Sequence, residues 1–190
     1  MISIPVFTQL VTFLHELGHA LATIVTGGHV TSLQVNLDGS GLCTSSGGIG
    51  LFIICGGYLG SILFGNLMFY AGLKHKYLSR FLAAVLAICL TITSLVWFST
   101  INSFLFTAGI GVVLLFLFVK FPWSGRAFMI ITGAYSIFYI LHDYQIGPSS
   151  DLRAFSNIAG LNPTLWMYIW LMLALVITML FVGKLLVKRK

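Results

Sequence analysis

Long apolar segments, separated by short polar ones, run through most of the chain. Six of these segments hold about 20 mostly apolar residues each, which is the number an α-helix needs to cross a bilayer. They cover residues 4–26, 48–73, 78–100, 103–121, 126–144 and 164–186. Few residues separate the third segment from the fourth, and we interpret that pair as a membrane hairpin. The pattern predicts an all-α polytopic membrane protein with six transmembrane helices, formed by a single domain over residues 1–190.

The polar segment between the first two spans has a pattern of its own. Residues 30–36 have strand-like composition, Asp38-Gly39 is a turn signal, and residues 41–45 can form a returning strand. We therefore expect a small β-hairpin at the membrane surface. Two interpretations stay open: the hairpin is a plain connection, or its outer edge pairs with an extended substrate strand.

Two further features flank the last span. Ser149 or Ser150 can cap a short amphipathic helix over residues 152–159. Aromatic side chains at the start of the span are typical of a belt at the membrane interface. They are Trp166, Tyr168 and Trp170.

Composition and charge exclude a soluble domain and a nucleic-acid partner. The chain is 58% hydrophobic and only 7% charged, as polytopic membrane proteins are. Its net charge is +6, but the basic residues lie in short runs beside the spans rather than in one patch. A six-span topology puts all of them except Arg153 on one side. By the positive-inside rule, both termini are then cytoplasmic, and the basic residues that follow the last span meet anionic lipid.

The first span contains the candidate chemistry, in the sequence HELGH. His15 and His19 are four residues apart, so on a helix they project from the same face and can bind one zinc ion. Glu16 lies beside them, where a general base for a zinc-bound water belongs. Zinc lowers the pKa of that water to about 7. Ionisable residues in a span cost several kcal/mol, which favours a metal site over polar side chains that merely link helices.

HELGH in a first span resembles the site-2 protease family of intramembrane zinc metallopeptidases, in particular its short bacterial and plant branch without accessory domains. The glycine-rich GGYLGSILFG of the second span is similar to that branch as well. The resemblance implies a zinc endopeptidase that cleaves a membrane-anchored protein in or near its membrane span. It also implies an integral protein of a bacterial cell membrane.

Two other functions remain open. A zinc or proton transporter could use His15, Glu16 and His19 as a relay, but it predicts further ionisable residues in the interior of the second, third and fourth spans, whose few charged residues lie only at their ends. The other alternative is a catalytically inactive scaffold of the same fold.

A catalytic zinc site usually has three protein ligands, and with Glu16 as the base three aspartates remain for the third. Asp38 is most simply a turn residue, although Leu37-Asp38-Gly39 matches the letters of a ligand motif that larger site-2 proteases carry after a much later span. His19 lies roughly 10 Å from the outer end of its span, and Asp143 roughly 6 Å from the end of the fifth. These similar depths favour Asp143.

Asp151 is the competing third ligand. It falls beyond the Gly147-Pro148 break, where helix capping accounts for it. The resembled branch, however, carries both an Asp at the end of its fifth span and a Ser-Asp pair after it, which keeps Asp151 as a candidate. His142 points about 100° away from Asp143 on a helix and could at most support a ligand.

Overall fold

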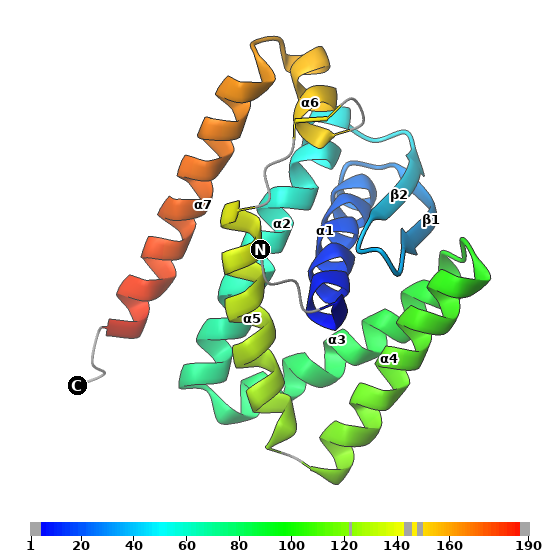
Figure 1. Ribbon diagram of the computed structural model, residues 1–190, viewed down its shortest axis with the longest axis vertical. Coiled ribbons are helices and arrows are strands. Elements are labelled where there is room, and N and C mark those ends of the chain that lie inside the picture. Colours follow the sequence, from blue (N-terminus) through cyan, green and yellow to red (C-terminus); the bar gives the residue numbers. More distant parts are fainter. Residues whose placement is uncertain (1–4, 122, 143–145, 148–149, 187–190) are drawn as a thin grey trace.

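The computed structural model describes residues 5–121, 123–142, 146–147 and 150–186 (Figure 1). These residues form seven helices and one two-stranded sheet. In chain order the elements are α1 (Pro5–Val25), β1 (His29–Val35), β2 (Gly41–Ser46), α2 (Gly50–Lys74), α3 (Lys76–Val96), α4 (Ile101–Lys120), α5 (Ser124–His142), α6 (Asp151–Ala159) and α7 (Pro163–Leu186). The mostly helical fold, the hairpin after the first helix and the short sixth helix are confirmed.

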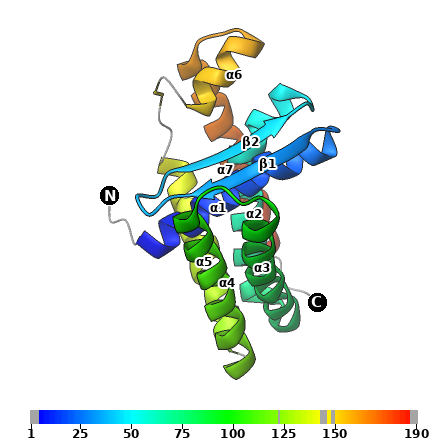
Figure 2. The same ribbon diagram turned by 90° about the vertical axis from the view of Figure 1, so that its right-hand side faces the viewer.

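Five helices are long and apolar enough to cross a membrane, namely α2, α3, α4, α5 and α7. This is the pattern of a multi-pass membrane protein. The segment predicted as the first span forms the unbroken helix α1 but is not among the five, because His15, Glu16 and other polar residues make it less apolar. Helix α1 lies between the hairpin and helices α2 and α5 (Figure 1), and it runs obliquely to α3 and α4 (Figure 2). Protein therefore surrounds much of α1 in place of lipid.

Glycines bring the backbones of α1 and α2 into contact. A Cβ atom at Gly18 would overlap the carbonyl oxygen of Gly56, and one at Gly60 would lie 3.0 Å from the Gly18 Cα atom. The small residues of the second span thus let two helices approach closely. This places the HELGH face of α1 directly against α2.

The hairpin lies over α1 as an antiparallel pair, with His29 opposite Ser46 and Val35 opposite Gly41. Asp38 is the turn residue that the sequence predicts, since its carboxylate accepts hydrogen bonds from the Ser40 N–H (2.9 Å) and hydroxyl (2.7 Å). These bonds hold the pKa of Asp38 below its usual value.

The corner between α3 and α4 covers the outer edge of β1. The Leu33 N–H donates to the Trp97 carbonyl (3.0 Å), and the Val35 N–H donates to the Ser103 hydroxyl (2.9 Å). Two opposed residues in an antiparallel pair direct their N–H and C=O groups either toward each other or both outward, away from each other. The Leu33 N–H points outward, to Trp97. Cys43, opposite Leu33, therefore directs its peptide group to the outer edge of β2. No role of α3 and α4 was predicted from the sequence, and these two hydrogen bonds show one: the helices hold the hairpin in place.

Candidate metal centre

Helix α1 brings His15 and His19 together as their spacing predicts. Their Nε2 atoms are 3.1 Å apart, and the two rings meet edge to face with centroids at 4.7 Å. The Nδ1 atom of His19 lies 2.7 Å from the Ile53 carbonyl oxygen. A carbonyl only accepts, so Nδ1 carries the hydrogen, and the Nε2 atom of a neutral ring is left to bind a metal.

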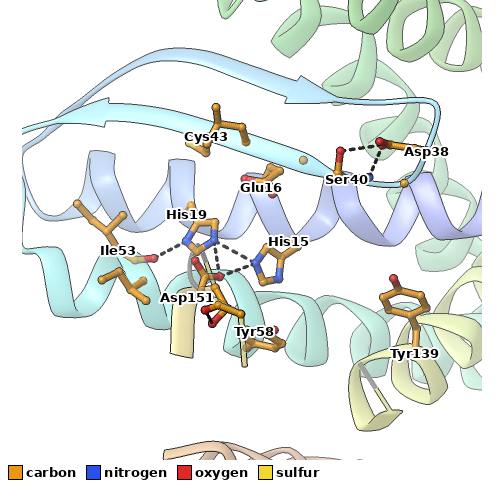
Figure 3. A pocket seen from close by; sticks show the side chains of 16 residues that line it. His15, Glu16, His19, Asp38, Ser40, Cys43, Ile53, Tyr58, Tyr139 and Asp151 are labelled. Carbon is orange, nitrogen blue, oxygen red and sulfur yellow. Dashed lines mark hydrogen bonds and ion pairs between the residues drawn. The ribbon is translucent and has the colours of Figure 1, made fainter. Parts of the chain in front are cut away.

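Asp151 meets both histidines (Figure 3). Its Oδ2 atom lies 2.8 Å from the His15 Nε2 atom and 3.1 Å from the His19 Nε2 atom. Among the described residues, these three side chains are the group whose donor atoms are close enough to share a metal ion. Burial by itself would raise the pKa of Asp151, but the bonds to the two rings outweigh it and hold this pKa below its usual value.

Asp151, which the sequence places beyond the Gly147-Pro148 break, reaches the two histidines because α6 folds back over them. The cap of α6 is Ser150, whose hydroxyl accepts from the Arg153 N–H (3.4 Å), so capping does not account for Asp151. Asp143, which the depth argument favoured, lies outside the described residues. The Ser-Asp pair of the resembled branch was the signal that pointed to Asp151.

Aromatic side chains hold α6 in this position. Leu152 and Phe155 of α6 are buried together with Trp170 of α7. The Trp170 ring lies 5.2 Å from both the Phe155 ring and the Tyr58 ring, and Tyr58 meets His15 edge to face at 4.9 Å. A continuous ring contact thus links the helix that carries Asp151 to His15. Trp170, predicted for an interfacial belt, is instead buried here at 2% exposure.

The donor atoms fit a zinc ion. Tetrahedral bonds of about 2.0–2.1 Å put ligand atoms roughly 3.3 Å apart, and the three separations in the structure are 2.8, 3.1 and 3.1 Å. Gly57 of α2 leaves this place clear, because a Cβ atom there would lie 2.5 Å from the Nε2 atom of each histidine. Two imidazoles and one carboxylate are also a donor set that zinc accepts.

Glu16 lies beside the three donors, on the side of α1 that faces β2 (Figure 3). It is buried, and its carboxylate meets the outward backbone N–H of Cys43. A Cβ atom at Gly41 would lie 2.5 Å from its Oε1 atom. A cavity of about 600 Å³ is lined by Glu16, the three donors and the β2 residues Gly41 to Cys43. A carboxylate, a metal-binding cluster and a strand edge therefore open onto one space.

Two other histidines lie away from the three donors. His29 is exposed at the start of β1, as expected for a surface residue. The His142 Nδ1 atom binds the Phe138 carbonyl (2.8 Å) of its own helix. Sequence reasoning missed Gly57 and Tyr58 as parts of the site, since both belong to the glycine-rich segment GGYLGSILFG, which was compared only with the second span of the resembled branch.

Comparisons with curated proteins and with solved structures found no match. The family model described as Peptidase M50B-like matches residues 2–181. The match includes the helix that bears HELGH, the hairpin and the short helix that bears Asp151. The resemblance to the site-2 proteases is confirmed at this level: the chain belongs to the Peptidase M50B-like family.

Proposed function

We propose that the protein is an intramembrane zinc endopeptidase that hydrolyses peptide bonds in or near the membrane spans of other proteins. The observation that carries this proposal is the meeting of His15, His19 and Asp151 beside the buried Glu16 at one cavity. Membership of the Peptidase M50B-like family supports the same reaction class.

Each residue at the cavity has a proposed role. The Nε2 atoms of His15 and His19 and the Asp151 carboxylate would hold a zinc ion. Zinc bound there would supply Lewis acidity, which acidifies water and polarises a carbonyl group. Glu16 accepts the proton of the attacking water and returns it to the nitrogen of the leaving amine. The Ile53 carbonyl keeps the His19 ring in the orientation that directs Nε2 to the metal.

The outer edge of β2 is the proposed substrate guide. The α3–α4 corner covers the edge of β1, whereas Gly41 and Cys43 of β2 border the cavity beside Glu16. A peptide that pairs with this edge gains main-chain hydrogen bonds and is extended at the same time. An extended backbone also exposes the peptide bond that a helix would shield. This favours the substrate-binding interpretation of the hairpin over a plain connection.

Removal of the metal tests the proposed function. The purified protein should cleave a membrane-anchored model substrate, lose this activity when a chelator removes its zinc, and regain it with added zinc. His19→Ala should lack both zinc and activity, whereas His29→Ala, which changes an exposed histidine, should keep both. Full cleavage by protein shown to be free of metal would contradict the proposal.

We also propose that both termini face the cytoplasm of a bacterial cell. The α2–α3 turn, the α4–α5 turn and the end of α7 lie at one end of the molecule, away from α6 (Figure 1). Basic residues gather at these three places, as cytoplasmic segments require. Reporter fusions after Lys76, Phe121 and Lys190 should report cytoplasm, and fusions near Asp38 and Gly160 the other side. A shared side for Asp38 and Lys76 would rule out this topology.

A further inference from the structure

A second cavity, of about 320 Å³, lies between α2, α5 and α7. None of the three metal-binding residues lines it. Its walls are almost entirely apolar, with large side chains from all three helices: Phe69, Tyr70, Phe138, Leu141, Phe181 and Leu185. At one end, the Asn66 side-chain amide donates to the Ile62 carbonyl (2.8 Å) and to the Thr178 hydroxyl (3.1 Å). With that amide hydrogen-bonded, the cavity presents hydrocarbon to an occupant.

The dimensions of the cavity suit a single hydrocarbon chain. Along α7 it extends from Thr178 to Leu185, which is about 10 Å at the rise of a helix. Its volume then corresponds to a cross-section on the order of 30 Å². A cavity this narrow suits an extended acyl chain better than a helix, which with its side chains is about 10–12 Å wide.

Positive charge lies at the other end of the cavity. The Lys184 Nζ atom lies 5.7 Å from the centre of the Phe181 ring, which lines the cavity. Tyr70 meets Phe181 at 6.0 Å, and Lys74 ends α2 one turn beyond Tyr70. An apolar cavity with a basic rim complements a molecule that joins an acyl chain to an anionic headgroup.

Helix α7 is less buried at this level than nearer its N-terminus. Its buried residues are Trp170 and Ala174, both in its N-terminal half. Beyond them, α7 diverges from α5 (Figure 1), and the cavity fills the space between these helices and α2.

We propose that this cavity binds one acyl chain of an anionic phospholipid, with the headgroup at Lys184 and Lys74. Electrostatic attraction selects the headgroup, and apolar burial holds the chain. The bound lipid fills the space between the three helices, so that the C-terminal half of α7 packs through it against α2 and α5. The proposal rests on charge and shape away from the metal centre and does not depend on the peptidase reaction.

Native mass spectrometry of the full chain in detergent tests it, with phosphatidylglycerol and phosphatidylcholine of identical chains as probes. The parent should retain one phosphatidylglycerol more tightly than phosphatidylcholine. Lys184→Gln should weaken phosphatidylglycerol binding by about fivefold, whereas Lys120→Gln, which changes a lysine in the same setting at the end of α4, should not. Ala134→Phe, which fills the cavity, should remove the bound lipid, and Val113→Phe on the exposed face of α4 should keep it.

Equal retention of the two lipids by the parent would show only general solvation by lipid and would overturn the proposal. Unchanged phosphatidylglycerol binding in both Lys184→Gln and Ala134→Phe would also overturn it, because the lipid would then bind elsewhere. The Lys184→Gln result stands even if Ala134→Phe disturbs folding, since Lys184 lies at the rim.

Discussion

Glu16→Gln should keep its zinc and lose peptidase activity by about 10²- to 10⁴-fold, the usual contribution of a general base. Glutamine has nearly the same shape as glutamate, so packing against Gly41 and the Cys43 backbone N–H is preserved. The amide, however, cannot accept the proton of the attacking water. The three residues proposed to hold zinc are unchanged, so binding of the metal and catalysis separate in this variant.

Two measurements on the same sample check this expectation: zinc per chain by elemental analysis, and cleavage of a membrane-anchored substrate in detergent or vesicles. Zinc content near the parental value is the internal control for folding. Cleavage at the parental rate would show that Glu16 is not the base. Loss of zinc together with activity would instead give Glu16 a structural role at the site.

Asp151→Ala should lower zinc affinity by at least about 100-fold, which exceeds the usual effect of losing a partner of a ligand. The reason is the position of its Oδ2 atom, within 3.1 Å of both histidine Nε2 atoms. Two imidazoles alone leave the ion short of protein ligands. Asp143→Ala should retain zinc, because Asp151 already completes a set of three.

The control for this experiment is Ser150→Ala. It removes the cap of α6, at a cost of about 1 kcal/mol, but leaves the Asp151 carboxylate in place. If Ser150→Ala keeps its zinc, loss from Asp151→Ala cannot be ascribed to a weakened helix. Zinc retained by Asp151→Ala and lost from Asp143→Ala would return the third ligand to Asp143. Measurement of zinc stoichiometry against a competing chelator distinguishes these outcomes.

Local sequence patterns were sufficient to predict most helices, the hairpin and the meeting of the two histidines. Apolar length is enough to locate α2, α3, α4, α5 and α7, and a turn signal with strand-like flanks is enough for the hairpin. The i, i+4 spacing brings His15 and His19 together because both lie on one helix. These features depend on residues that are neighbours in sequence.

The features that were not predicted depend on contacts between residues far apart in the sequence. Asp151 reaches the histidines because Phe155 and Leu152 pack with Trp170, and no local pattern in 150–160 encodes that direction. Depth along straight spans would place Asp151 too far from the histidines, because a chain that continued outward beyond Gly147 would carry it away from them. The contact of the α3–α4 corner with β1 could not be predicted either, since Trp97 accepts the bond through its main-chain carbonyl, which every residue type possesses.

The α3–α4 corner has a consequence for how the sequence can change. It holds the hairpin through one carbonyl and one hydroxyl, so the exposed positions of α3 and α4 can exchange one apolar residue for another at little cost. The segment from Trp97 to Ser103, by contrast, does not tolerate a change in length. A single inserted residue would shift the Ser103 hydroxyl away from the Val35 N–H. Apolar substitutions at the exposed positions of α3 and α4 should therefore have little effect on the fold. An insertion or deletion at their corner would displace β1 and, with it, β2 beside Glu16.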